Sequence, residues 1–220
     1  MAAMPAMSPI GPSDSIANWF ASPAGQALLD SETVIVDRAL GDRPGQPWLW
    51  LAPVPAATLP EGRGLHLVRA AHGWRGAVDC DVPLPLPSEA FGTVLVQHVL
   101  RLGDADSDAL LSEVARILMP GGRLWLFALN PLAPYRWHWR SAGLSCAEPL
   151  SWRRRLRLAG LVPDPVSQGL GPRWKPQSSQ VLQHGAGLRA AYVMRAEKRQ
   201  LPLTPVRGHR FQLTQGAPAA

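Results

Sequence analysis

The stretch LPLPSEAFGTVLVQHVLRLGDADSDALLSEVARILMPGGRLWLFALNP, residues 84–131, decides the fold. Its segment 92–100 is an apolar run of the kind that forms a strand buried on both faces. Residues 104–119 begin with acidic side chains and repeat apolar ones at helical spacing, which predicts an amphipathic helix. The Pro-Gly-Gly sequence at 120–122 is expected to stop this helix, and 123–129 is again apolar. The stretch therefore predicts strand, helix and strand in succession, the unit of a parallel sheet.

Further strands are expected before and after this unit. An apolar run at 49–52 precedes the proline-rich segment PVPAATLPEG, residues 53–62. The segment PLPLPSEAF, residues 83–91, is predicted to be a loop, because its prolines lack the N–H group that a central strand needs. Alternation or apolar character predicts three more strands, at 64–70, 76–80 and 187–199.

Three more helices are expected. The first follows a cap at Asp14 or Ser15 and stops near Pro23. The second covers AGQALLDSETVIVDRAL, residues 24–40, with an apolar stripe at Leu29, Thr33, Val36 and Leu40. The third is the basic segment 151–160, closed by Gly160. The alternation of strands and helices predicts an α/β fold, with a mainly parallel sheet and helices on both faces.

The length of 220 residues suits one domain. We expect a disordered N-terminus at 1–13, the folded domain at 14–199 and a loose basic tail at 200–220. The two cysteines, Cys80 and Cys146, lack the spacing of a metal site, and buried reduced thiols are the plain expectation. The N-terminal segment is unlike a secretory signal, and no apolar run approaches the roughly 18 residues of a membrane span. A cytoplasmic protein without a metal is expected.

Charge is unevenly distributed along the chain, whose formal net charge is +6. Residues 1–122 hold 7 Lys and Arg against 13 Asp and Glu, whereas residues 123–220 hold 15 against 3. Such a basic half can attract nucleic acid or other anions, although arginine-rich solvated faces also have this composition.

Several motifs in residues 84–131 occur in one order: Leu84-Pro85-Leu86, then Phe91, His98, Leu110-Leu111, Glu113 and Arg116, then Pro120-Gly121-Gly122. In this order they resemble the class I S-adenosylmethionine (SAM)-dependent methyltransferases, methyltransferase type 11 group. The resemblance extends to a proteobacterial subgroup through WFASPAGQALLDSE, FALNP and LPLTPVR. It implies a Rossmann-like fold, SAM as cofactor and transfer of its methyl group to an acceptor.

The resemblance also implies which residues hold the cofactor. In this family it lies at the carboxyl ends of the first and fourth strands, with an acid after the third. The corresponding positions here are Leu51, Ala52, Pro53, Asp81, Val82, Gln97 and His98. His98 would also suit a general base, although a structural role is equally open. By the two-residue period of a strand, Gln97 is expected on the opposite side from His98.

Three positions depart from the family pattern. The loop after the first strand has no glycine before Gly62, although glycines let the backbone approach the cofactor closely. Arg69 stands near the place of the acid that holds the ribose hydroxyls. Gly92 replaces the aspartate that usually follows Phe91. The cofactor therefore binds through a rearranged loop or has been lost.

On the acceptor side, Asn130, Tyr135 and Trp137 are the candidates. The segment YRWHWR, residues 135–140, suits a lid over a small-molecule pocket, and its aromatic and cationic side chains also suit single-stranded nucleic acid. The leading function is a SAM-dependent methyltransferase with a small-molecule acceptor. The alternative is a non-catalytic binding module that has lost the cofactor, and direct RNA binding is a third hypothesis.

Overall fold

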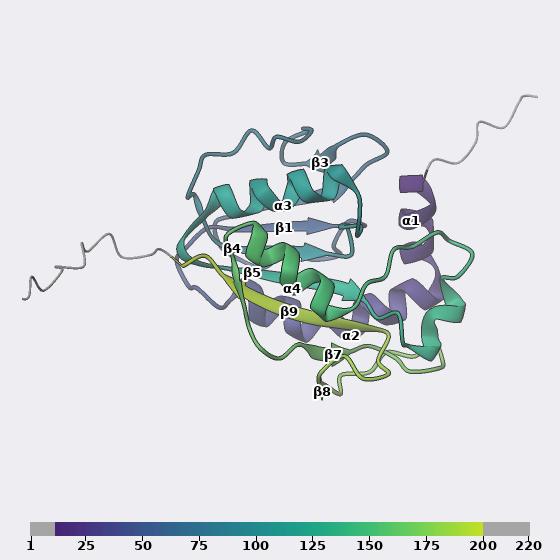
Figure 1. The fold of residues 1–220 in the computed structure, drawn as a ribbon. Coiled ribbons are helices and arrows are strands. Elements are labelled where there is room, and N and C mark those ends of the chain that lie inside the picture. The colour runs from purple at the N-terminus through teal and green to yellow at the C-terminus, as the bar shows by residue number, and fades with distance from the viewer. Residues whose placement is uncertain (1–11, 200–220) are drawn as a thin grey trace, which may run out of the picture.

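The order of the strands in the sheet identifies the architecture. The computed structural model describes residues 12–199, and its described strands form one nine-stranded sheet in the order β3-β2-β1-β4-β5-β9-β7-β8, with β6 paired to β9 (Figure 1). The central strands β1, β2, β4 and β5 run parallel, whereas β3 is antiparallel to β2 and β9 is antiparallel to β5. This is the α/β fold with a mainly parallel centre that the sequence predicted. The strands are β1 (Trp48–Ala52), β2 (Gly64–Arg69), β3 (Trp74–Gly76), β4 (Phe91–Gln97), β5 (Leu118–Leu129), β6 (Val162–Pro163), β7 (Gln168–Leu170), β8 (Gln183–His184) and β9 (Ala191–Glu197).

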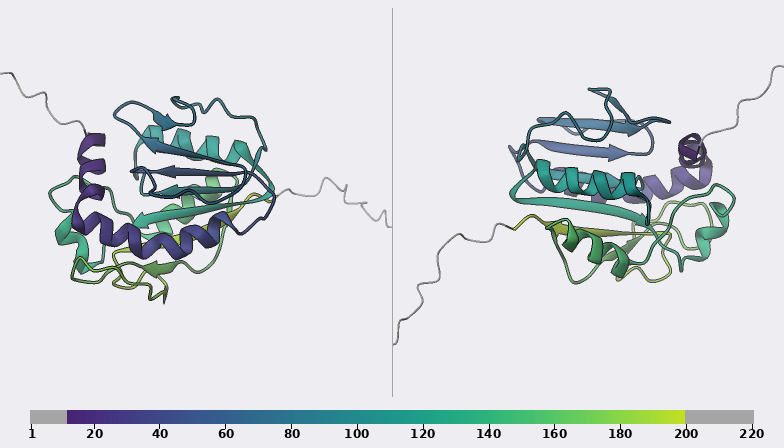
Figure 2. Two further views of the ribbon diagram at one scale, coloured as in Figure 1. Left: turned by 180° about the vertical axis from the view of Figure 1, so that it is seen from behind. Right: turned by 45° about the horizontal axis from the view of Figure 1, so that its top comes forward.

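Helices cover both faces of the sheet, as Figure 2 shows. On one face, α3 (Ala105–Ile117) and α4 (Pro149–Leu158) bury their apolar sides against the strands. On the other face lies α2 (Pro23–Leu40), which follows α1 (Pro12–Ala21). All seven residues of β4 are buried, which explains the continuous apolar run that predicted it.

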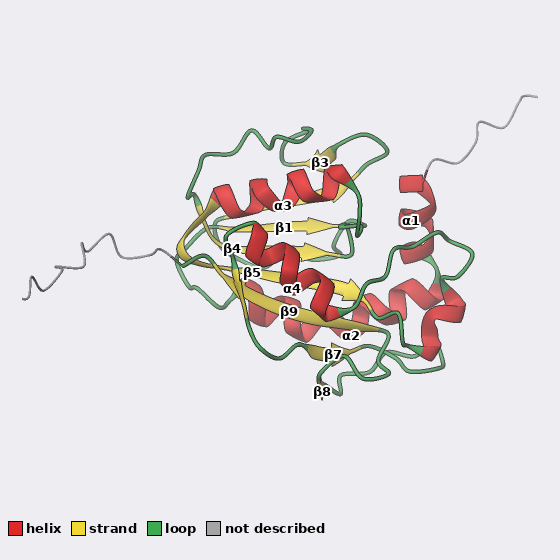
Figure 3. Cartoon of the chain, in the orientation of Figure 1, coloured by secondary structure: helices red, strands yellow, loops and turns green. Residues whose placement is uncertain are grey.

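Only one connection between neighbouring parallel strands contains a helix. In the part of the chain that the structure describes, α3 joins β4 to β5, whereas β1 passes to β2 through a loop (Figure 3). Residues 53–60 of that loop include three prolines, so they resist both a helix and a strand. The face of β1 on that side is covered by α2 instead.

Several boundaries differ from the sequence-based expectation. The short third strand is Trp74–Gly76 rather than 76–80, and Cys80 contributes a single bridge to Trp74. The helix α3 ends at Ile117, and Pro120-Gly121-Gly122 lies inside β5, where Gly121 adopts a φ of 70°. Cys80 and Cys146 are free thiols as expected, but Cys80 is only half-buried and Cys146 is exposed.

The expected disorder at 1–13 and the loose tail at 200–220 fall outside the described residues, apart from Pro12 and Ser13 at the start of α1. None of the described helices is both long and apolar enough to cross a bilayer.

Candidate functional site

A pocket of about 280 Å³ lies between α2 and the loop that follows β1. Its floor is formed by Trp50, in the middle of β1, and by Gln97, the last residue of the neighbouring parallel strand β4. The loop at the carboxyl end of β1 encloses the pocket along that edge of the sheet. In open α/β sheets this edge is the usual place for ligands. The remaining lining comes from α2 and from the loop: Gln26, Leu29, Asp30, Thr33, Val36, Asp37 and residues 54–60.

The lining of this pocket is mostly apolar and carries charge of one sign. Asp30 and Asp37, both on α2, are its only charged residues, and both are exposed at the rim. Trp50 contributes an indole ring, whose face attracts cations. The pocket therefore suits a small ligand with an apolar part and a positive charge.

A chain of buried hydrogen bonds lies beneath the pocket floor. The indole of Trp50 donates to Oε1 of Gln97 at 3.1 Å, and the amide of Gln97 donates to Oε2 of Glu32 at 2.7 Å. The other oxygen of Glu32 lies 2.8 Å from Nε2 of His98. Glu32 is 0% exposed, so both of its oxygens depend on these protein partners. The chain ties the middle of α2 to the middle of β1 and to the end of β4.

His98 is enclosed by this arrangement. Its side chain is 1% exposed, and its ring stacks on Phe20 at a centroid distance of 5.1 Å. Its backbone has a φ of 55°, which ends the extended geometry of β4. The expectation that Gln97 and His98 point to opposite sides is therefore wrong: outside the strand the two-residue period no longer applies, and both side chains reach Glu32.

Glu32 is a residue that the sequence analysis missed. The expected stripe at Leu29, Thr33, Val36 and Leu40 is out of phase, because Thr33 is exposed and Leu29 only half-buried. The buried face of α2 instead includes Leu28, Ile35 and Ala39, with Glu32 among them. A carboxylate at helical spacing within these apolar positions was the available signal.

The first strand's loop offers a poor cradle for the cofactor of the resemblance. Leu51, Ala52 and Pro53 are buried, and residues 47–61 contain no glycine that would admit a ligand close to the backbone. At the end of β2, the guanidinium of Arg69 lies over the ring of Trp74, 5.3 Å from its centroid. A cation fixed there does not hold ribose hydroxyls as an acid does.

The acids after β3 lie elsewhere. Asp81 is exposed, and Oδ1 of Asp79 accepts a hydrogen bond from the N–H of Gly76 at 3.4 Å. Neither residue lines the pocket, nor does Val82, which packs against the core on the α3 side. Of the seven cofactor candidates, only Gln97 lines the pocket, with His98 beside it through Glu32. The residues present therefore do not fit the family's usual way of holding SAM.

Packing explains why position 92 is a glycine. A Cβ atom at this position would collide with the side chain of Gln46. The aspartate of the family pattern has no room here, because Gln46 occupies that space.

The three acceptor candidates are not brought to the pocket. The amide of Asn130 donates to the carbonyls of Gly187 and Arg189, both at 2.9 Å, and its oxygen accepts from Leu132. Tyr135 is 0% exposed and donates to the carbonyl of Ala24. Burial raises the pKa of Tyr135 to about 12.

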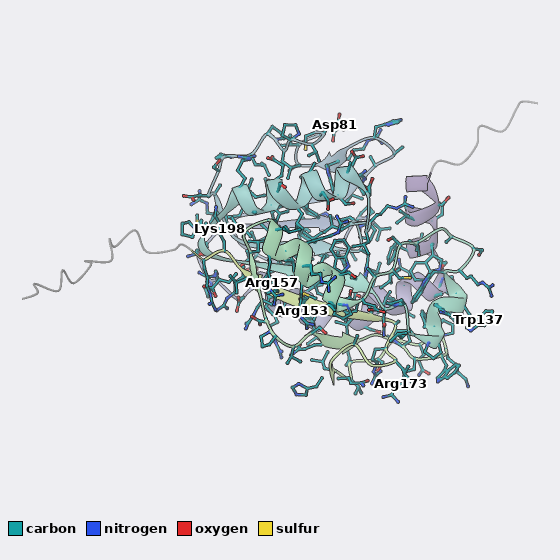
Figure 4. The ribbon with its side chains drawn as sticks, in the orientation of Figure 1. Asp81, Trp137, Arg153, Arg157, Arg173 and Lys198 are labelled. Carbon is teal, nitrogen blue, oxygen red and sulfur yellow. The ribbon has the colours of Figure 1, made fainter. Side chains whose placement is uncertain are left out.

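Trp137 is 64% exposed and lies at the outer edge of the molecule, at the right of Figure 4. It belongs to the 3₁₀ helix η1 (Pro134–His138), which does not contribute to the pocket. Within residues 12–199, no group of three or more His, Cys, Asp or Glu side chains is placed to hold a metal ion.

Part of the chain matches a known family model. Residues 63–126 match the family model described as a methyltransferase domain, Methyltransf_11. A SAM-dependent methyltransferase from Thermotoga maritima, described as a possible histamine N-methyltransferase, is 17% identical with a TM-score of 0.57, covering 83% of this chain and 94% of that chain. No curated protein matches the chain.

A second solved structure comes from Haloferax volcanii, the Trm112 methyltransferase activator in complex with a protein described as a methyltransferase. The matched chain of that structure is 13% identical to this chain with a TM-score of 0.54, and the match covers 84% of this chain and 98% of that chain. At these identities the structural likenesses show the fold. Residues 63–126 thus carry the sequence of the type 11 methyltransferase domain, and the described chain has the class I SAM-dependent methyltransferase fold.

Proposed function

We propose that this chain binds a positively charged small molecule in the pocket between α2 and residues 54–60. The observation that carries the proposal is the charge of the lining, where two carboxylates and an indole accompany uncharged residues, most of them apolar. The volume of about 280 Å³ lies near the lower end of the range for small-ligand sites. A ligand of a few to a dozen heavy atoms is expected.

The geometry favours a non-catalytic binding module built on the methyltransferase fold. His98, the candidate base, is closed off from solvent and engaged by Glu32. Arg69 stands where an acid would hold the ribose of SAM, and a proline-rich loop stands where glycines would let the backbone approach SAM closely. Ligand binding in the pocket does not need Arg69, and it uses the proline-rich loop as a wall rather than as a backbone cradle for SAM.

The second candidate is a SAM-dependent methyltransferase with a small-molecule acceptor. The family match over residues 63–126 favours it, and SAM is itself a cation. Because the residues at the usual cofactor positions do not fit, this function requires SAM to bind in another pose.

Calorimetric titration of the full chain separates these functions. Choline and its uncharged isostere 3,3-dimethylbutanol serve as probes of the pocket's charge preference, and SAM and S-adenosylhomocysteine as probes of the family activity. We expect choline to bind more tightly than the isostere. Asp30→Asn and Asp37→Asn should each weaken choline binding about two- to fivefold, the effect of an exposed charge pair.

The control is Asp106→Asn, which removes a charge of the same sign from the first turn of α3. Equal binding of choline and the isostere contradicts the proposed cation site. Saturable SAM binding, followed by conversion to S-adenosylhomocysteine with an added amine, establishes the enzyme and rejects the non-catalytic module.

A further inference from the structure

Two exposed tryptophans on separate segments each follow an arginine and precede a basic residue. Trp137 lies between Arg136 and His138, and Trp174 lies between Arg173 and Lys175. The two indoles are 64% and 67% exposed, whereas most other tryptophans of the described chain are buried. We call residues 136–140 and 173–175 together the Arg-Trp surface.

The two segments of this surface are adjacent in space. Nε2 of His138 lies 3.0 Å from the carbonyl oxygen of Trp174. The guanidinium of Arg140 lies over the ring of Trp137, 5.0 Å from its centroid. Figure 4 shows Trp137 and Arg173 at the same lower right edge of the molecule, away from α3 and α4.

The surface rests on a buried scaffold. Tyr135 of η1 and Trp139, the residue that follows η1, are 0% and 3% exposed, and the three residues between them are exposed. The indole of Trp19 donates to the carbonyl of His138 at 2.7 Å. The backbone that carries Trp137 and its neighbours is therefore anchored before any partner binds, which lowers the entropic cost of binding.

No carboxylate occurs in either segment or near it in sequence. Between Glu113 and Glu148, and again between Asp164 and Glu197, the chain contains no Asp or Glu. The surface thus combines positive charges with planar rings and contains no negative charge in its two segments. The positive charges are complementary to phosphates, and the rings are complementary to unpaired bases.

We propose that the Arg-Trp surface binds single-stranded nucleic acid, with bases stacked on Trp137 and Trp174 and phosphates held by the flanking cations. A membrane anchor would need a continuous apolar face, whereas each indole here is flanked by charged or polar residues. Stacking discriminates little between bases, so the binding tolerates many sequences. The proposal uses no residue of the pocket and is independent of the function proposed above.

Fluorescence anisotropy with a labelled oligouridylate of about 12 nucleotides tests the proposal on the full chain. Binding should weaken steeply between about 50 and 300 mM KCl, because each neutralised phosphate releases counterions. Trp137→Ala and Trp174→Ala should each weaken binding at least about fivefold. Both side chains are exposed, and unchanged melting temperatures verify that the variants fold.

A matched pair of double variants separates this surface from general charge attraction. Arg136→Ala with Arg173→Ala should weaken binding more than Arg154→Ala with Arg157→Ala, which removes the same charge from the exposed side of α4. Equal losses in the two pairs, or no loss in the tryptophan variants, overturn the proposal. Equal affinity for a double-stranded oligonucleotide also overturns it. Tighter binding to phosphatidylserine vesicles that depends on both tryptophans assigns the surface to a membrane instead.

Discussion

The β4–β5 and β1–β2 halves of the sheet each contain a pair of parallel strands, but the connections between the paired strands differ. The pair β4–β5 is joined by α3, whose apolar side packs on the sheet; β4 is fully buried, and β5 is buried from Leu124 to Leu129. The pair β1–β2 is joined by a loop, and β2 has a single buried residue, Leu67. The motifs of the type 11 family are concentrated in the β4–β5 half.

The difference shows that the family motifs and the candidate site lie in different parts of the sheet. In the β4–β5 half, the crossover helix α3 covers one face of the strands together with α4, and α2 lies on the other face. In the β1–β2 half the missing helix leaves space beside Trp50, and α2 and residues 54–60 enclose that space as the pocket. The part of the chain that departs from the family pattern is therefore the part that forms the candidate site.

The largest expected effect tests whether α2 replaces the missing helix. Glu32→Ala removes the partner of both Gln97 and His98 and should lower the free energy of unfolding by about 3–5 kcal/mol. Urea denaturation measures it. Thr33→Ala, one position along on the exposed side of α2, is the control. A loss equal to that of the control would mean that the buried chain of hydrogen bonds does not hold α2 on the sheet.

The next effect compares the two halves directly. Leu126→Ala in β5 removes a side chain that is 1% exposed and should cost about 2–5 kcal/mol. Leu65→Ala in β2 removes a half-buried leucine and should cost about 1 kcal/mol. Both variants retain the backbone pairing, and the same denaturation measurement applies. Equal costs would show that the β1–β2 half is packed as tightly as the other.

The smallest expected effect concerns the pH dependence of stability, and it tests a carboxylate in the β4–β5 half. Hydrogen bonds from Arg116 hold the pKa of Glu113 below its usual range, with smaller contributions from the charge of Arg116 and the N–H of Leu84, while burial opposes them. A lowered pKa in the folded state stabilises the protein above the unfolded value of about 4.3, and this stability is lost as pH falls further. Unfolding measured from pH 5 to pH 3 should show a smaller loss for Glu113→Gln than for the unmodified chain.

The control for this measurement is Glu61→Gln, which changes an exposed carboxylate near the β1–β2 loop. Its loss of stability between pH 5 and pH 3 should be close to that of the unmodified chain. A Glu113→Gln variant with the same pH dependence as the unmodified chain would contradict a stabilising role for this carboxylate.

The β4–β5 half could be predicted from the sequence because its signals are local. A fully buried strand reads as an apolar run, and α3 has acids at its start and apolar side chains on one face. The phase of α2 was harder, because small residues such as Ala27 and Ser31 share its buried face with larger ones. A shift of one residue was enough to hide Glu32.

The candidate site was less predictable because it depends on contacts between distant residues. Glu32 and His98 are 66 positions apart, and nothing local indicates that they meet. The sequence of residues 135–140 shows that aromatic and basic side chains alternate there. It does not show which of them are buried, because this depends on contacts with the distant residues Trp19 and Ala24. The proline-rich loop after β1, by contrast, is a local signal, and the departure that it predicts at the cofactor positions stays a prediction.

The pairing of β9 with β5 has a consequence for synthesis of the chain. Residues 130–190 separate these neighbouring strands, and at about 5–20 residues per second they take roughly 3–12 s to be made. During that time β5 presents an unpaired, largely apolar edge. The nascent chain is thus most prone to aggregate just before its last strand emerges, and variants that slow the pairing of β9 should lower soluble yield more than they lower equilibrium stability.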